Sequence, residues 1–336
     1  MSQVIDRPYR KEVVVITGAS AGLGRAIAEE FARHGARIGL IARGKERLDA
    51  AVSEMKRLGG DAIALPADVS HSEEVEKAAE RVEAAFGPID VWVNNAMTTV
   101  FAQLIDITPE EYRRATEVTY LGAVWGAKAA LKHMLPRNRG AIVQIGSALA
   151  YRSIPLQSPY CGAKHAIVGF IDSLRCELIH NHADVRVSVV HMPALNTPQF
   201  DWCKTRMRGR PQPVPPIYNP ESPARAVYWA AHHHPRELYV ALSTRAAIFG
   251  NEIAPGLLDR YLGRTGYQSQ QSDQQVSSSR SDNLFESVPG DFAAHGRFDD
   301  EAINRGMWPG ARRIAIWGGL ATLVLVGTRL ASNRLR

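Results

Sequence analysis

The 336-residue chain contains few cysteines, few aromatic residues and no acidic residue close to its C-terminus. Its three cysteines, Cys161, Cys176 and Cys203, show no CxxC spacing, so the sequence predicts neither a disulfide framework nor a cysteine metal site. This usage is typical of a reducing compartment. With 45% hydrophobic and 22% charged residues, the composition excludes wholesale disorder, a collagen-like chain and a multi-span membrane protein.

The positive charge is concentrated at one end of the chain. Six arginines and no acid follow Ala302, and these six charges equal the net charge of +6, so residues 1–301 are formally neutral. A neutral body argues against nucleic-acid binding, which needs a basic face. A basic and apolar tail indicates a membrane instead.

Short β-branched segments alternate with alanine-rich amphipathic segments as far as about Leu242. This alternation predicts βαβ units and a parallel sheet covered by helices on both faces. About seven strands fit one Rossmann-like, doubly wound α/β sheet. The expected strands are 13–16, 38–41, 62–65, 91–93, 141–145, 185–190 and 238–242, and the expected helices include 23–34, 46–58, 73–86 and 111–135.

Changes of composition divide the chain into four expected parts. A single catalytic domain, residues 1–245, precedes a helical extension, 246–266, that Pro255 interrupts. Residues 267–309 are expected to form a disordered polar linker, since 267–283 alone contain five Gln and six Ser. Residues 310–331 are expected to form an apolar C-terminal helix.

A glycine-rich turn lies between the first expected strand and the first expected helix. Glycine lets the backbone approach a phosphate, and a helix N-terminus offers free N–H groups and the positive end of its dipole. The turn could instead merely pack the helix on the strand, but its context favours dinucleotide binding. The residues that we assign to the cofactor here are Thr17, Gly18, Ser20, Gly22, Leu23 and Gly24.

The end of the second strand bears on the choice of dinucleotide. An acid at this position would bind the adenosine ribose hydroxyls. Here the chain continues with Arg43, Gly44 and Lys45. An arginine with no acid beside it suits a 2′-phosphate, so NADP(H) is favoured over NAD(H). A solvated surface arginine is the alternative.

Four more motifs follow in order along the chain. They are Asp68-Val69, Asn94-Asn95-Ala96, Ser147 at the end of the fifth strand, and Tyr160 four residues before Lys164. Together with the TGxxxGxG turn, they resemble the short-chain dehydrogenase/reductase family over residues 10 to about 245. The resemblance implies an NAD(P)-dependent oxidoreductase in which Asp68 and Val69 hold the adenine, and Asn94 and Ala96 line the cofactor.

The chemistry of the last motif can also be derived from the residues. A free tyrosine has a pKa of about 10, and a lysine at i+4 lies on the same helix face, where its charge favours the phenolate. Ser147 can donate a hydrogen bond to a substrate oxygen. The resemblance implies the same roles: Tyr160 as acid and base, Lys164 also bridging to the nicotinamide ribose, and Ser147 as orienter.

Three positions depart from the family pattern. Thr119 stands where the family carries an asparagine that completes a proton relay, and we assign it a catalytic role with a less complete hydrogen-bonding capacity. Met97 replaces a glycine beside the cofactor. The motif after the sixth strand has lost its glycine, and Thr197 is expected to contact the cofactor carboxamide.

The tract of His232, His233 and His234 has two interpretations. It precedes Pro235 at the end of a helical segment, where histidines suit the negative end of the helix dipole. Consecutive helical positions point in different directions, so this interpretation is favoured over a metal site, and we expect no metal.

The uncharged run 314–328 would form a helix of about 22 Å, shorter than a bilayer core of about 30 Å unless its flanking arginines snorkel. It is apolar on all sides, which favours a membrane anchor over a helix packed on the enzyme. No signal peptide is expected, because Arg7, Arg10 and Lys11 stand where an apolar segment would be needed. A cytoplasmic enzyme with a C-terminal membrane anchor is the resulting prediction.

The leading hypothesis is a carbonyl reductase or secondary alcohol dehydrogenase acting on a small apolar substrate. A catalytically slow dinucleotide-binding sensor or scaffold recruited to membranes is the alternative. A third is an interaction protein whose linker and tail are the functional parts. A homo-oligomer is implied by the resemblance alone.

Overall fold

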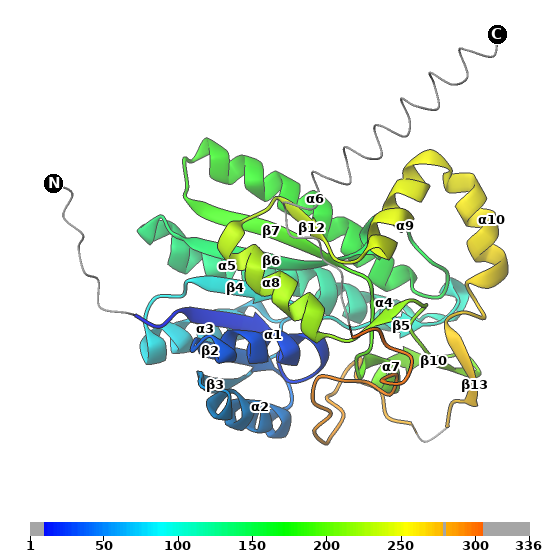
Figure 1. The fold of residues 1–336 in the computed structure, drawn as a ribbon, viewed down its shortest axis with the longest axis horizontal. Helices are drawn as coiled ribbons and strands as arrows, with labels where there is room; N and C mark the ends of the chain where they lie inside the picture. The colour runs from blue at the N-terminus through cyan, green and yellow to red at the C-terminus, as the bar shows by residue number, and fades with distance from the viewer. Residues whose placement is uncertain (1–9, 278–279, 305–336) are drawn as a thin grey trace, which may run out of the picture. The chain divides into compact units, whose positions relative to one another are not determined.

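A parallel sheet of seven strands forms the centre of the computed structural model, which describes residues 10–277 and 280–304 (Figure 1). The strand order is β12-β7-β6-β4-β1-β2-β3, so the chain builds outward from β1 and then crosses over to β4. This is the doubly wound arrangement, and it confirms the predicted fold class and the seven expected strands. Their bounds are β1 (Val13–Thr17), β2 (Arg37–Ala42), β3 (Asp61–Pro66), β4 (Val91–Asn94), β6 (Gly140–Ser147), β7 (Val185–Met192) and β12 (Glu237–Tyr239).

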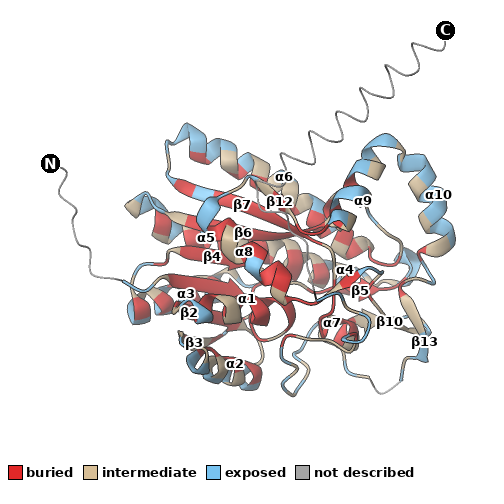
Figure 2. Cartoon of the chain, viewed as in Figure 1, coloured by how far each residue is buried: buried red, intermediate tan, exposed pale blue. Residues whose placement is uncertain are grey.

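Helices cover both faces of the sheet. On one face α1 (Gly22–Arg33) packs against α8 (Glu221–His233) and α2 (Lys45–Arg57). On the other face lie α3 (Ser72–Phe86), α5 (Gly122–Met134) and the long α6 (Ser158–His180). The central strands are therefore buried on both sides, as Figure 2 shows. The continuous apolar run of β1, with every residue buried, is the sequence signature of such a strand.

The expected helix 111–135 is divided into three parts. α4 (Pro109–Thr116) begins with a capping box, in which Thr108 and Glu111 satisfy each other's backbone N–H groups. A π-helical turn, Glu117–Leu121, follows and leads into α5. Such turns insert an extra residue into a helix and are frequent at functional sites. This one carries Thr119.

The segment between β7 and α8 is held down by short strand pairs. β8 (Ala194–Leu195) pairs with β11 (Ile217–Tyr218), and β9 (Lys204–Thr205) pairs with β5 (Val100–Phe101). Between them lie α7 (Gln199–Trp202) and β10 (Gly209–Pro211). We call residues 197–220 the lid. The helical extension follows as α9 (Leu242–Ile253) and α10 (Pro255–Thr265), divided at Pro255 as expected.

The expectation of a disordered linker at 267–309 is wrong for the part that the structure describes. β13 (Gln271–Gln275) pairs with β10, and the buried Gln270 donates to the carbonyls of Gly266 (2.7 Å) and Pro155 (2.9 Å). Leu284 is fully buried. Polar composition misled the prediction because buried polar side chains are stable once they are hydrogen-bonded.

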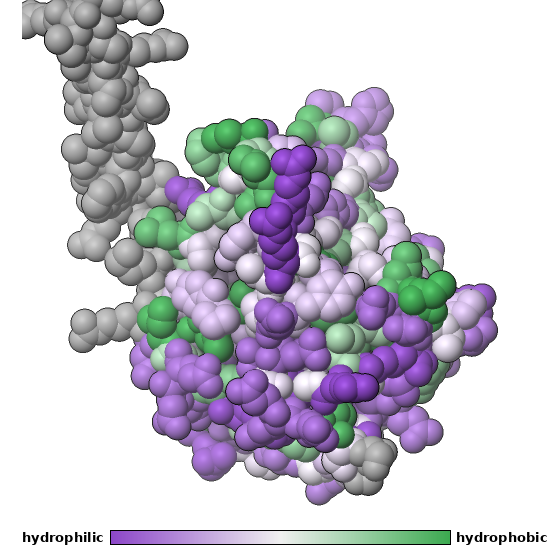
Figure 3. Space-filling view, turned by 90° about the vertical axis from the view of Figure 1, so that its right-hand side faces the viewer, coloured by the Kyte–Doolittle hydropathy of each residue, from purple (hydrophilic) through white to green (hydrophobic). Residues whose placement is uncertain are grey.

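No helix within the described residues is long and apolar enough to cross a bilayer. The predicted apolar helix 310–331 lies outside these residues and stays a prediction. Apolar side chains are exposed on α9 and α10, on the side of the molecule that Figure 3 shows, where hydrophilic surface separates the hydrophobic patches. The largest of them are Phe249, Ile253, Leu257 and Tyr261.

Candidate active site

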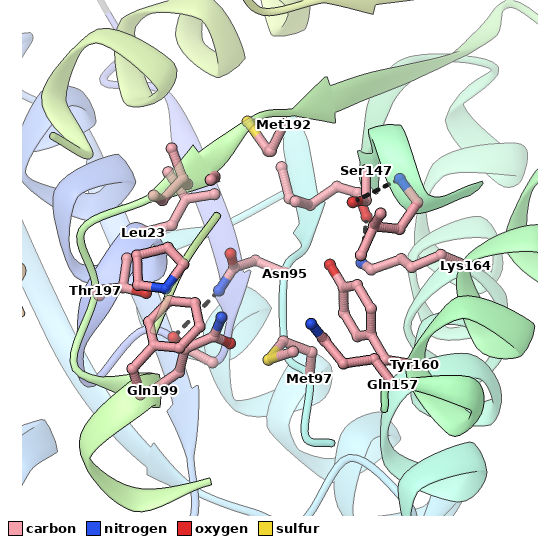
Figure 4. A pocket seen from close by; sticks show the side chains of 18 of the residues that line it. Leu23, Asn95, Met97, Ser147, Gln157, Tyr160, Lys164, Met192, Thr197 and Gln199 are labelled. Carbon is pink, nitrogen blue, oxygen red and sulfur yellow. Dashed lines mark hydrogen bonds between the residues drawn. The ribbon is translucent and has the colours of Figure 1, made fainter. Parts of the chain in front are cut away.

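A cavity of about 420 Å³ lies at the carboxyl ends of the central strands. This is where open α/β sheets bind their ligands. One part of its wall is the glycine turn after β1, with the ends of β2 and β3 beside it. The opposite part contains the end of β6 and the start of α6, and Figure 4 shows side chains from both parts facing the same space.

The glycine turn fits a pyrophosphate. Gly18 has a φ of +66°, and a Cβ on Gly24 would lie 2.1 Å from the Gly18 carbonyl oxygen, so neither position accepts a side chain without rearrangement. α1 begins at Gly22 and its N-cap residue, Ala21, makes no side-chain cap. The N–H of Gly22 donates to the Ala293 carbonyl (2.9 Å), and no side chain caps the N–H groups that follow it in the first turn of α1, which suits an anionic group. Ser20, Gly22 and Leu23 line the cavity with them.

Two of the assigned cofactor residues, Thr17 and Asn94, instead use their side chains to bind other parts of the protein. Thr17 Oγ1 accepts hydrogen bonds from the backbone N–H groups of Asn95 (2.9 Å) and Ala96 (3.1 Å) and is buried. Asn94 points into the core, where it accepts from Trp92 (2.8 Å) and donates to the Ala123 carbonyl (3.1 Å). The assignment of Thr17 and Asn94 to direct cofactor contact is therefore corrected.

The side-chain amide beside the glycine turn belongs to Asn95. This residue is part of the Asn94-Asn95-Ala96 motif, but we did not assign it a role from the sequence. Its Nδ2 donates to the carbonyls of Thr17 (3.0 Å) and Gly18 (3.2 Å). Figure 4 shows the Asn95 side chain at the cavity. Asn95, Ala96 and Met97 all line the cavity. The loop after β4 thus supports the turn after β1, and the backbone of Ala96 forms part of the cavity wall.

Charged residues gather where β2 and β3 end. Arg43 donates to the carbonyls of Phe285 (2.8 Å) and Asn283 (2.5 Å), which belong to the C-terminal part of the chain. Asp68 accepts from Arg114 and from the backbone N–H of Ser70 (3.0 Å). Arg43, Asp68 and Val69 line the cavity as expected. No sequence motif pointed to Arg114.

Their pKa values follow from these contacts. Burial raises the pKa of Asp68, but the hydrogen bonds from Arg114 and Ser70 outweigh it and hold the pKa below its ordinary value. Burial lowers the pKa of Arg43, and the nearby carboxylate of Asp68 opposes this change. Asp68 is therefore ionised at neutral pH, and an arginine stays charged throughout this range.

Ser147, Tyr160 and Lys164 lie together on one side of the cavity (Figure 4). Ser147 ends β6, and the other two are one turn apart near the start of α6. Lys164 is buried, its Nζ donates to the Ile145 carbonyl at 2.7 Å, and it lies 5.5 Å from the centroid of the Tyr160 ring. The structure thus brings together the three side chains that sequence reasoning grouped.

The ionisation of this group differs from the expectation. Burial raises the pKa of Tyr160 to about 12, although a hydrogen bond with Ser147 opposes the shift. Burial also lowers the pKa of Lys164 to about 7. Desolvation disfavours the charged form of each side chain. Tyr160 is consequently a neutral phenol at neutral pH, which is the form that can donate a proton.

Thr119 does not take the catalytic position that we expected. It is 1% exposed, its hydroxyl donates to the Thr98 carbonyl (2.8 Å), and it accepts from the Thr98 N–H (3.0 Å). A hydroxyl has a single donor, so Thr119 has none left for a relay water. Its neighbour Val118, rather than Thr119, lines the cavity. The catalytic assignment is corrected to a structural one that fixes the loop after β4.

Thr197 lies at the junction of the glycine turn and the lid. Thr197 is buried and lines the cavity, and a Cβ added to Gly22 would lie 3.3 Å from the Cβ of Thr197. The lid therefore begins in contact with the turn. Figure 4 shows Thr197 and Gln199 across the cavity from Tyr160.

Sequence reasoning missed a partly buried polar network behind Ser147. His191, in β7, is fully buried, with Nδ1 3.3 Å from the Ser147 carbonyl and Nε2 3.0 Å from Glu237. Tyr151 and Tyr239 each donate to the same Glu237 oxygen at 2.6 Å. The hydrogen bond with His191 is the largest of the effects that hold the pKa of Glu237 far below its ordinary value. A histidine inside an apolar strand was the available signal.

The histidine tract ends α8, as the favoured interpretation has it. His232 Nδ1 lies 2.7 Å from the Tyr228 carbonyl, and His233 stacks on Trp229 with ring centroids 4.3 Å apart. Within residues 10–277 and 280–304, no group of three or more His, Cys, Asp or Glu side chains is arranged to hold a metal ion.

The doubly wound sheet and the glycine turn at its cavity define a dinucleotide-binding protein of the Rossmann type. The particular family follows from comparison with known proteins. The chain belongs to the short chain dehydrogenase family, whose model matches residues 12–205. It is thus an oxidoreductase of a family that uses NAD(P) cofactors.

Individual relatives support this assignment. The chain is 35% identical over 269 residues to the uncharacterized oxidoreductase YxnA of Bacillus subtilis, a match that covers 80% of this chain and 76% of that protein. It is 37% identical over 167 residues to human 17-beta-hydroxysteroid dehydrogenase 13, covering 50% and 56%. A 3-ketoacyl-ACP reductase from Sinorhizobium meliloti 1021 has a similar structure, with a TM-score of 0.60 and 27% identity over 68% of this chain and 96% of that chain.

Proposed function

We propose that the chain is an NADP(H)-dependent carbonyl reductase or secondary alcohol dehydrogenase. The observation that carries this proposal is the convergence of Ser147, Tyr160 and Lys164 on a cavity that also contains the glycine turn. A dinucleotide bound along the turn would direct its nicotinamide toward these three side chains and would supply or accept a hydride there.

The chain's own residues handle the proton. The neutral phenol of Tyr160 donates its proton to the oxygen of a carbonyl substrate, and the hydroxyl of Ser147 donates a hydrogen bond to the same oxygen. The phenolate that remains is stabilised by the ammonium of Lys164, whose pKa of about 7 keeps part of it charged at neutral pH. We assign the nicotinamide ribose to Lys164 as well. In the oxidation direction the same groups act in reverse.

NADP(H) is proposed as the cofactor because Arg43 follows β2 with no acid directly beside it, and a second arginine, Arg47, follows in the first turn of α2. Arg43 and Arg47 both line the cavity. An arginine has five N–H donors, and the carbonyls that bind Arg43 leave donors for a phosphate. A charge-assisted hydrogen bond of this kind contributes about 1.5–3 kcal/mol, which favours a 2′-phosphate over a free ribose hydroxyl.

A small apolar substrate is proposed from the other residues around Tyr160. The part of the cavity wall that the dinucleotide motifs do not supply is largely apolar. Such a wall selects for apolar surface and leaves Ser147 and Tyr160 to orient one polar oxygen. The apolar lining residues include Leu149, Ile154, Met192, Val214, Ala247 and Leu262. Assembly into a homo-oligomer stays a prediction from the family.

The test is NADPH oxidation by the full chain with a panel of apolar and charged carbonyl compounds. We expect turnover with apolar ketones or aldehydes, and a loss of about 10²- to 10⁴-fold in Tyr160→Phe with NADPH binding retained. Tyr261→Phe, on the exposed surface of α10, is the matched control and should keep full activity. Substantial turnover by Tyr160→Phe would contradict the mechanism. Tight NADPH binding without turnover on any compound would favour the sensor hypothesis.

A further inference from the structure

Residues 283–298 form a C-terminal strap across the cofactor cavity. The strap lies outside the residues that match the family model, 12–205. The match to the similar reductase covers 96% of that chain but only 68% of this one. About a third of this chain therefore has no counterpart in that reductase. The strap nevertheless contributes Asn283 and Ser287 to the cavity wall.

The first half of the strap is bound to the end of β2 and the start of α2. Arg43 donates to the carbonyls of Asn283 and Phe285, and Arg47 donates to the carbonyl of Val288 at 2.5 Å. These are bonds from side chains to backbone, so they fix the path of the strap whatever its own side chains are. They also hold both guanidinium groups at the cavity wall.

The second half is bound to the glycine turn and to the start of the lid. The N–H of Gly22 donates to the Ala293 carbonyl at 2.9 Å. Asn196, directly before the lid, accepts from the N–H groups of Gly296 (3.4 Å) and Phe298 (3.0 Å). The strap therefore connects the two elements between which a dinucleotide must lie.

Aromatic packing fastens the middle of the strap to the lid. Phe292 meets Trp202 of α7 edge to face, with ring centroids 4.8 Å apart. The guanidinium carbon of Arg47 lies 4.9 Å from the Trp202 ring and 5.7 Å from the Phe292 ring. Such contacts between cations and rings add to the hydrogen bonds of Arg47 and keep its charge next to the cavity.

Ser287 lies beside these contacts, at a polar part of the cavity wall. Its Oγ lies 3.5 Å from the position that a Cβ on Gly44 would take, and Arg47 Nε is at the same distance from that position. Among the described residues the Ser287 hydroxyl has no hydrogen-bond partner, and the side chain is exposed. A hydroxyl donor, two guanidinium groups and the backbone of Gly44 therefore surround one space, which is the donor set that a phosphate requires.

We propose that the strap is a wall of the dinucleotide site and that the Ser287 hydroxyl binds the adenosine 2′-phosphate beside Arg43. This inference rests on the proposed use of NADP(H). It makes the C-terminal part of the chain a determinant of cofactor choice, in addition to the arginine after β2. It also means that the strap helps to retain either dinucleotide through its contacts with Asn196.

The test is direct binding of NADPH and NADH to the full chain, measured by fluorescence titration. Ser287→Ala should weaken NADPH by about tenfold, and Ser287→Glu by more than that because it adds a like charge, while NADH changes less than about twofold. Ser281→Glu, an exposed serine before the strap, is the matched control and should bind both dinucleotides normally.

A second variant tests retention. A Cβ on Gly296 would lie 2.6 Å from the Thr197 carbonyl oxygen, so Gly296→Ala should push the strap off the lid and weaken both dinucleotides alike, by about fivefold. Gly263→Ala, with no atom within 4 Å of its added Cβ, is the control. Thermal unfolding of each variant checks that it is folded.

The outcomes separate three claims: the role of Ser287, the preference for NADP(H) and the role of the strap in retention. Unchanged NADPH binding in both Ser287 variants, with selective loss of NADPH in Arg43→Ala, would overturn the role of Ser287 and leave the proposed cofactor intact. Equal affinity of the unaltered chain for NADPH and NADH would instead overturn the preference for NADP(H). Normal binding of both dinucleotides by folded Gly296→Ala would overturn the role of the strap in retention.

Discussion

The dinucleotide-binding part of the chain, residues 13–197, and the C-terminal segment, residues 267–304, reach order by different routes. In the first part, apolar strands and amphipathic helices bury a common core, and each functional residue follows a strand or opens a helix. In the second part, few side chains are buried, and backbone carbonyls accept hydrogen bonds from arginines that belong to the first part. The two parts meet at the cavity.

The difference explains what a local pattern can and cannot convey. A strand or helix can be predicted from the periodicity of its apolar residues. A segment that is held through its main chain shows no such periodicity, because its position is determined by the residues that bind it. Here these residues are Arg43, Arg47 and Asn196. Two predictions test this contrast and a third tests the polar network behind Ser147, in order from the largest expected effect to the smallest.

Lys164→Met should separate activity from stability in the first part. We expect turnover to fall at least about a hundredfold, since Tyr160 loses its cationic neighbour. The free energy of unfolding should rise by about 1–2 kcal/mol at pH 7, because a buried amine with a pKa lowered to about 7 disfavours the folded state.

The pH dependence gives the sign of this effect. Below the ordinary lysine pKa of 10.5, protonation of Lys164 is less favourable in the folded protein than in the unfolded chain. The stability gained by Lys164→Met is therefore full below about pH 7 and fades as the pH rises toward 10. Chemical denaturation at several pH values measures it. Lys128→Met, on the exposed side of α5, is the control. A loss of stability at pH 7 would contradict the account.

Leu284→Ala tests whether a small apolar cluster anchors the strap to the rest of the protein. Leu284 is fully buried and packs with Val100, Ala102 and Ala115. Its truncation should cost about 2–4 kcal/mol of unfolding free energy, whereas Phe285→Ala, at a neighbouring side chain that is 52% exposed, should cost less than about 0.5 kcal/mol. Equal effects of the two substitutions would mean that the strap is not packed as described.

Glu237→Gln should weaken the network behind Ser147 by about 1–3 kcal/mol at pH 7. The pKa of Glu237 is held low chiefly by His191, so the carboxylate contributes stability above its ordinary pKa of 4.5 and loses it on acidification through the folded value. The difference from the natural protein should therefore shrink in acid. Glu252→Gln, an exposed residue of α9, is the control, and a difference that does not depend on pH would rule out the ionic explanation.

Much of the first part could be predicted from its residues. The seven strands, the helix break at Pro255 and the grouping of Ser147, Tyr160 and Lys164 all follow from periodicity and from motif order. Individual side chains were predicted less well, because a motif does not say which way each member faces. Asn94 and Thr119 lie within motifs yet bind the protein's own backbone.

The remaining features depend on contacts between distant positions. Arg114 meets Asp68 across 46 residues, and Arg43 meets Phe285 across 242. Neither pair leaves a local trace in the sequence. The burial of Gln270 likewise depends on carbonyls that only the folded chain brings near. The fold was therefore more predictable than the wall of the site.

Hydrogen–deuterium exchange of the full chain with and without NADPH tests most directly whether the two parts form one cofactor site. The strap amides of Gly296 and Phe298, which donate to Asn196, report on this contact. Because a dinucleotide would bridge the glycine turn and the strap, we predict that NADPH slows exchange across residues 283–298 by about fivefold or more. Exchange that is unchanged, or faster, with NADPH bound would contradict the account.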